Sequence, residues 1–157
     1  MSICDGGVIR HFEGAVQAII RLIQAGSITP EDVTMLHREI FAGEAISREE
    51  AEALFRLERA AKIKCAEWTA FFVEAITDHI VWHNRPTGVV NTPQAEWLIG
   101  ECDRTKSVTA LAVLVNVLAE AQRVPLWLPA AVKGRANAGW SGVREALDAA
   151  NIDAQAA

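Results

Sequence analysis

Residues 28–33 read Ile-Thr-Pro-Glu-Asp-Val, and a similar segment, Val-Asn-Thr-Pro-Gln-Ala, follows 62 positions later at residues 90–95. The spacing continues downstream, where these pairs match: Leu36 with Leu98, Glu39 with Glu101, Ile46 with Val108, and Ser47 with Thr109. Each segment has the pattern of helix, short loop, helix. A duplicated helical hairpin can bury its apolar faces against its copy. The sequence therefore predicts an all-α fold built from two pseudo-repeated hairpins, at about residues 28–62 and 90–122.

Helical signals extend over the whole chain, whereas strand signals are weak. Apolar residues recur at spacings of three and four. Capping boxes are predicted at two helix starts, Thr29 with Asp32 and Ser47 with Glu50. We predict about seven helices, no sheet, and a single domain over residues 1–157. Five of the expected helices have both ends assigned: about Val8 to Gly26, Thr29 to Phe41, Ser47 to Ala61, Cys65 to His83, and Pro129 to Ala149 with a break near Gly139. Two more are expected to begin at Thr92 and at Thr109. The helix from Thr109 is apolar on most sides, which is typical of the middle of a bundle.

Composition limits the classes of function. The chain has 157 residues, of which 51% are hydrophobic and 22% charged, as in a globular protein. Its net charge of −5 predicts no nucleic-acid partner, because phosphates require a basic surface. No apolar stretch is long enough to span a membrane, and no secretory signal is recognised. Three widely separated cysteines, Cys4, Cys65 and Cys102, indicate reduced thiols and a cytoplasmic location.

Both inter-helix loops can be aligned with the twelve-residue EF-hand pattern. With Ile46 and Val108 at the eighth position, the acidic residues at ligand positions are Glu39, Glu50, Glu101 and Asp103. Calcium requires six to eight oxygen ligands, and each loop keeps only about half of the acidic positions. One interpretation is that the loops are ordinary helix connections whose aliphatic eighth residues are core anchors. The alternative is a divalent-metal site at these carboxylates.

The duplicated hairpin with EF-hand-like loops resembles the tellurite-resistance TerB-like all-helical proteins. The resemblance is carried by residues 46–55 (ISREEAEALF), 67–78 (EWTAFFVEAITD) and 95–99 (AEWLI), and it covers roughly residues 28–122. It is to an uncharacterised bacterial branch with degenerate loops. The resemblance implies a cytoplasmic, all-helical domain of a kind often tied to metal binding or stress response.

His79 and His83 form a second candidate metal site. A spacing of four places two imidazoles on one helix face, where a third ligand could complete a zinc site. The same stripe carries large apolar residues, so a histidine with a structural hydrogen bond is the alternative. No HExxH motif is present, because Ile80, Val81 and Trp82 separate the two histidines.

Enzymatic motifs are weak. Glu58 lies in the apolar stripe of its helix, where a carboxylate must be paired or have a raised pKa. We interpret it as half of a buried ion pair with an arginine such as Arg38 or Arg59, and alternatively as a catalytic acid. A pocket lined by His79, His83 and Glu58 would favour an enzyme. Without a nucleophile motif or a phosphate loop, we predict a non-enzymatic protein.

Two tryptophans fall outside the expected core stripes. Trp97 points away from the apolar face of its helix, and Trp127 lies in a loop between two prolines. Displaced tryptophans often mark interfaces, although they can also cover the end of a bundle. The apolar first helix predicts either a lid or a dimerisation helix, which keeps a homodimer open. The function predicted is a cytoplasmic, TerB-like interaction or regulatory domain with a protein partner and no cofactor; the alternative is a divalent-metal-binding protein.

Overall fold

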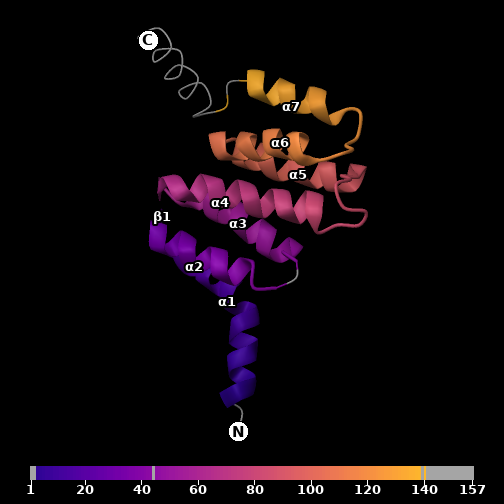
Figure 1. Cartoon of the computed structure of the whole chain (residues 1–157). Coiled ribbons are helices and arrows are strands. Elements are labelled where there is room, and N and C mark those ends of the chain that lie inside the picture. The colour runs from indigo at the N-terminus through magenta and orange to yellow at the C-terminus, as the bar shows by residue number, and fades with distance from the viewer. Residues whose placement is uncertain (1–2, 44, 139, 141–157) are drawn as a thin grey trace, which may run out of the picture. The chain divides into compact units, whose positions relative to one another are not determined.

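The computed structural model describes residues 3–43, 45–138 and 140, with backbone only for residues 3–13. The fold is all-α, as predicted, with seven α-helices in the described part of the chain (Figure 1). They are α1 (Ile3–Ala25), α2 (Pro30–Ile40), α3 (Arg48–Ala60), α4 (Ala66–Thr77), α5 (Thr92–Thr105), α6 (Val108–Glu120) and α7 (Leu128–Asn137). The π-helix η1 (Asp78–Trp82) continues α4. The predicted break near Gly139, and the predicted helix beyond it, lie outside the described residues.

The chain divides into two compact units, residues 1–79 and 80–157. Each unit holds one copy of the hairpin: α2 and α3 in the first, α5 and α6 in the second. The expectation of one domain over residues 1–157 stays a prediction. No helix in the described part of the chain combines the length and the apolar character that a membrane crossing requires.

Local capping explains where the hairpin helices begin. Thr29 and Asp32 form the predicted capping box of α2, and Ser47 and Glu50 form that of α3. Such boxes satisfy backbone N–H groups that a helix start leaves unpaired. The N-cap of α5 is Asn91, one residue before the predicted Thr92, and its side chain accepts from the N–H of Gln94.

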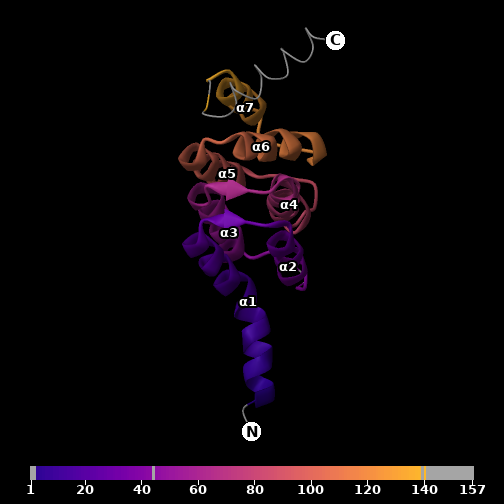
Figure 2. The ribbon, with the colours of Figure 1, turned by 90° about the vertical axis from the view of Figure 1, so that its left-hand side faces the viewer.

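A small parallel strand pair corrects the expectation of no sheet. Strand β1 (Ser27–Ile28) pairs with β2 (Ile63–Lys64), and the two lie side by side in Figure 2. The second unit has a matching parallel bridge between Val89 and Arg123. The strands were missed because two residues are too few to show an alternating pattern.

Two glycines, 62 positions apart, repeat this arrangement. Gly26 and Gly88 have φ values of 76° and 81°, a region that L side chains rarely adopt. The Gly26 carbonyl accepts from the N–H of Lys62 at 2.9 Å, and the Gly88 carbonyl accepts from that of Gln122 at 2.7 Å. The open end of each hairpin is therefore closed by the same backbone contact, which supports a duplication.

The spacing of the repeat changes at the inter-helix loop. The side chains of Ser47 and Ser107 cap α3 and α6, so these two helices are 60 residues apart, not 62. The buried residues Ala53, Leu54 and Leu57 of α3 then match Val113, Leu114 and Val117 of α6. The predicted matches of Ile46 with Val108 and of Ser47 with Thr109 were wrong, because the chain between equivalent positions of the two helices is two residues shorter in the second copy.

Each unit has its own apolar core. In the first, the second half of α1 packs on α2 and α3, and both of those pack on α4. Its centre holds an aromatic group in which Phe72 lies 5.0 Å from Phe55 and 5.5 Å from Trp68 between ring centroids. In the second, α6 packs on α5 and α7. Helix α6 is less enclosed than predicted, since the side chain of Val115 is 53% exposed.

Candidate functional site

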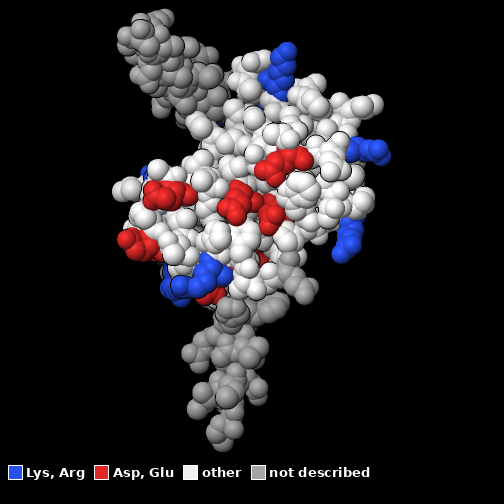
Figure 3. All heavy atoms as spheres, in the orientation of Figure 1, with Lys and Arg blue, Asp and Glu red and all other residues white. Residues whose placement is uncertain are grey.

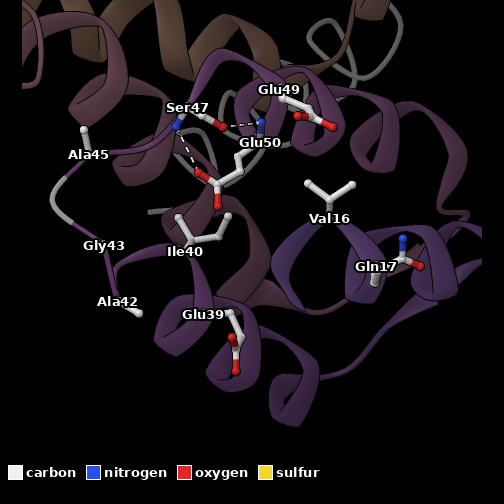
Figure 4. Close-up of a pocket in the computed structure, with 10 residues that line it drawn as sticks. All are labelled: Val16, Gln17, Glu39, Ile40, Ala42, Gly43, Ala45, Ser47, Glu49 and Glu50. Atoms are coloured by element: carbon white, nitrogen blue, oxygen red, sulfur yellow. Dashed lines mark hydrogen bonds between the residues drawn. The ribbon is translucent and has the colours of Figure 1, made fainter. Parts of the chain in front are cut away.

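A pocket of about 430 Å³ lies in the first unit, between the second half of α1 and the α2–α3 hairpin (Figure 4). Its apolar part includes Val16 from α1 and Ile40 from α2, and Ile40 is buried. Three glutamates line it: Glu39 near the end of α2, and Glu49 and Glu50 in the first turn of α3. The other lining residues are Gln17, Ala42, Gly43, Ala45 and Ser47.

Local structure fixes two of these carboxylates. Glu50 Oε1 accepts a hydrogen bond from the backbone N–H of Ser47 at 2.9 Å, drawn as a dashed line in Figure 4. Glu39 lies against the backbone of α1, where a Cβ added to Gly14 would stand 3.1 Å from Glu39 Oε2. Gly14 therefore permits this close approach. The predicted pair Glu39 and Glu50 is brought to one pocket, but half of the Glu50 carboxylate serves as a helix cap.

The acidic residues of the second loop already have partners. Glu101 is 5% exposed and forms an ion pair with Arg104, three residues along α5. The Asp103 carboxylate accepts from Arg135 Nε at 2.7 Å and from Arg135 Nη2 at 2.8 Å. These hydrogen bonds, and the positive charge of Arg135, hold the pKa of Asp103 below its ordinary value. Glu101 and Asp103 therefore act as acceptors for guanidinium groups of the same chain.

The structure does not support the predicted metal site at His79 and His83. His79 Nδ1 donates to the backbone carbonyl of Ile46 at 2.7 Å, because a carbonyl can only accept. Residues Asp78–Trp82 form a π-helix, in which hydrogen bonds join residues five apart. The rule that places residues four apart on one face of an α-helix therefore does not apply to His79 and His83. Among the side chains described, those of residues 14–43, 45–138 and 140, no group of three or more His, Cys, Asp or Glu is placed to hold a metal ion.

Glu58 is buried, as predicted, but its partner is not an arginine. Its Oε2 lies 2.9 Å from Lys64 Nζ, and its Oε1 accepts from Trp68 Nε1 at 2.7 Å. The pocket described above does not include Glu58, His79 or His83. The sequence did not indicate Lys64 as the partner, because Lys64 lies in β2, after the end of α3. Helical periodicity does not show that the chain turns back there and brings Lys64 to Glu58.

The two predicted partner-binding tryptophans differ in exposure. Trp97 is half-buried on α5, while Trp127, at the start of α7, is 40% exposed. Its neighbour Leu126 is fully exposed, at 100%. Sequence reasoning had not singled out Leu126. Its place beside a tryptophan between two prolines is the signal that could have found it.

The distribution of charged side chains on the surface agrees with the net negative charge of the chain. On the face drawn in Figure 3, acidic side chains lie among uncharged ones, and the described residues form no continuous basic area there. The absence of a nucleic-acid partner stays a prediction.

Comparison with known proteins gives no further guide to the site. No family model, no curated protein and no solved structure matches this chain. The interpretation of the site therefore depends on the chain's own chemistry.

Proposed function

We propose that this chain is a non-enzymatic, cytoplasmic interaction domain of TerB-like type, which binds a protein partner through Leu126 and Trp127. One observation carries the proposal: a fully exposed leucine stands beside a 40% exposed tryptophan. Burying an apolar side chain is favourable by about 25 cal/mol per Å² of surface removed from water, so a partner that covers these side chains gains this free energy. Exposed apolar groups of this kind are typical of interaction sites, and tryptophan is enriched at interface hot spots.

The backbone holds these two residues outward. Leu128, next in the chain, is 1% exposed, and its N–H donates to the carbonyl of Pro125 at 3.0 Å. The carbonyl of Trp127 accepts from the N–H of Ala131 at 3.1 Å, in the first turn of α7. The buried Leu128, which is also the first residue of α7, fixes the loop on its C-terminal side. Preordering of this kind lowers the entropy lost on binding.

Other observations support the remaining parts of the proposal. The TerB-like part of the proposal is supported by the duplicated hairpin on which that resemblance is based, because each unit holds one copy. Cys65 and Cys102 are free thiols, as expected in a reducing compartment. Metal binding, the alternative function, stays a prediction.

The test is a quantitative pull-down with Leu126→Ser and Leu126→Ser/Trp127→Ala variants. The matched control is Ile63→Ser, which removes a 71% exposed isoleucine from the other unit. We expect a partner that the wild type and Ile63→Ser capture equally and that both Leu126 variants lose. Unchanged circular dichroism would exclude unfolding as the cause. The same set of captured proteins with all four baits would reject the proposal.

A further inference from the structure

The exposed residues Leu126 and Trp127 lie in a part of the chain that has cations and no acids. They end the connection between α6 and α7, residues 121–127, which contains Arg123 and no aspartate or glutamate. The connection from η1 to α5, residues 83–91, likewise contains Arg85 and no acid. The whole chain has 20 acidic and 15 basic residues, so the charge of these two connections is opposite to that of the chain.

Backbone hydrogen bonds hold the two connections together. The Gly88 carbonyl accepts from the N–H of Gln122 at 2.7 Å and from that of Arg123 at 3.2 Å. The Arg123 carbonyl accepts in turn from the N–H of Val90 at 2.9 Å. In Figure 1 both connections lie at the right-hand end of the second unit, and the charged side chains visible at that end in Figure 3 are lysine or arginine. The apolar pair and the two arginines therefore share one end of this unit.

The two arginines are available to a partner. The side chains of Arg85 and Arg123 are exposed, and neither forms an ion pair with a described residue. The acid nearest to Arg123 in the sequence is Glu120, the last residue of α6. Its Oε1 accepts from Trp82 Nε1 at 2.8 Å, and its Oε2 accepts from Asn116 Nδ2 at 3.0 Å. These donors hold the Glu120 carboxylate on Trp82 and Asn116 and not on Arg123.

We propose that this end of the second unit binds an acidic peptide segment of the partner, in which an apolar side chain is flanked by carboxylates. The inference rests on the proposed function, because it adds the chemistry of the partner to the surface at Leu126 and Trp127. The apolar side chain covers these two residues, and the carboxylates meet Arg85 and Arg123. A guanidinium can take a carboxylate by two parallel hydrogen bonds. Complementary charge around an apolar centre speeds association and excludes partners of the wrong charge.

An anionic membrane surface would also offer negative charge, but it matches this surface less well. Basic clusters that bind anionic lipids typically hold about four to eight lysines and arginines. The two connections contain two, and the net charge of the chain is −5, which an anionic surface repels. A peptide can place a few carboxylates beside one apolar group, which is the arrangement that this surface complements.

The probe is the acetylated and amidated peptide Glu-Asp-Leu-Phe-Asp-Glu, titrated at low ionic strength into ¹⁵N-labelled full-length protein and followed by NMR. We expect saturable shifts of the amides of Arg123, Leu126 and Trp127, and a Kd that rises with added salt, because salt screens exposed charges. Two control peptides separate the parts of the surface. Gln-Asn-Leu-Phe-Asn-Gln lacks the charge and Glu-Asp-Ser-Ser-Asp-Glu lacks the apolar pair, and each should bind about tenfold more weakly.

Charge-matched variants locate the binding. Arg85→Gln/Arg123→Gln should weaken binding of the acidic peptide by about tenfold, or about threefold for each exposed ion pair, and should leave the affinity for the uncharged peptide within about twofold. The control, Arg21→Gln/Lys62→Gln, removes two exposed cations of the first unit and should change either affinity less than about twofold. Unchanged circular dichroism would show that both variants are folded.

The outcomes distinguish this inference from the proposed function. Equal binding of the acidic and uncharged peptides at Leu126 and Trp127, or equal weakening by the control variant, would overturn the choice of an acidic partner and leave the apolar surface intact. Equal binding of the serine peptide would count against both, because the apolar pair would then not be used. The absence of saturable shifts with the acidic peptide up to its solubility limit would overturn the inference, whatever the pull-down shows. Binding to phosphatidylserine vesicles in place of the acidic peptide would overturn it in favour of a membrane surface.

Discussion

Replacing Lys64 with methionine tests how the first unit holds a buried carboxylate. Glu58 is 2% exposed, and its two oxygens contact Lys64 Nζ at 2.9 Å and Trp68 Nε1 at 2.7 Å. Lys64 Nζ also donates to the Glu58 carbonyl at 3.1 Å. Methionine keeps the aliphatic stem and removes only the cation. The variant therefore leaves Glu58 with a single strong donor.

The expected loss follows from the burial of each partner. Breaking a fully buried ion pair by removing one partner costs about 3–5 kcal/mol. The Lys64 side chain is 27% exposed, so water can replace part of the lost interaction. We therefore expect the free energy of unfolding to fall by about 2–3 kcal/mol, a large share of the roughly 5–15 kcal/mol typical of a domain.

Urea unfolding at pH 7, followed by far-ultraviolet circular dichroism, measures this loss. With a slope of about 2 kcal/mol per molar urea, the midpoint should fall by about 1 M or slightly more. The matched control is Lys62→Met, which removes an exposed lysine two residues earlier. An exposed lysine contributes little to stability, so the urea midpoint of this variant should stay within about 0.3 M of that of the wild type.

A double-mutant cycle decides whether the pair itself is responsible. Glu58→Leu strands the Trp68 N–H, which costs about 1–3 kcal/mol. Once Glu58 is gone, Lys64→Met should cost almost nothing more, which gives a coupling of about 2 kcal/mol. If the two losses add within about 0.5 kcal/mol, Lys64 does not hold the carboxylate and the reasoning is refuted.

Two further predictions concern the second unit and the thiols. The lowered pKa of Asp103 means that its pair with Arg135 stabilises the fold above the unfolded pKa, near 3.9, and loses this effect as the pH falls through the folded pKa. Arg135→Met should therefore cost about 0.5–1 kcal/mol at pH 7 and progressively less as the pH falls through the folded pKa of Asp103; a loss that stays constant with pH would contradict this. Burial, with the charges of Asp103 and Glu101, raises the pKa of the Cys102 thiol far above its usual range. In a Cys4→Ser background, a thiol-reactive disulfide should label Cys65 in the folded protein and Cys102 only after unfolding; equally fast labelling of both would contradict this.

Much of the fold could be predicted because its causes are local. The capping boxes at Thr29 and Ser47 involve atoms three residues apart, and both are confirmed. The repeat was visible because the glycine turn and the first helix of each hairpin keep the 62-residue spacing. The change to 60 at the loop was missed, since a capping serine at 107 and a threonine at 109 are both acceptable N-caps.

The candidate site could be predicted only in part. The sequence placed Glu39 and Glu50 in one loop, and the structure places them at one pocket. It gave no sign that α1 would supply Val16 and Gln17 to the same pocket, because these residues lie more than twenty positions away in the chain. The expected role of Glu101 and Asp103 as metal ligands did not anticipate their arginine partners.

The sequence by itself determined the helices, their starts and the duplication, because periodicity and capping act within one or two turns. Tertiary structure decided which charges meet: Glu58 with Lys64, and Asp103 with Arg135. The physical reason is that a buried carboxylate must find a donor wherever the fold brings one close. That donor depends on how loops and strands return, which local patterns do not specify. The same packing leaves one loop with a carboxylate-lined pocket and provides its copy with arginines.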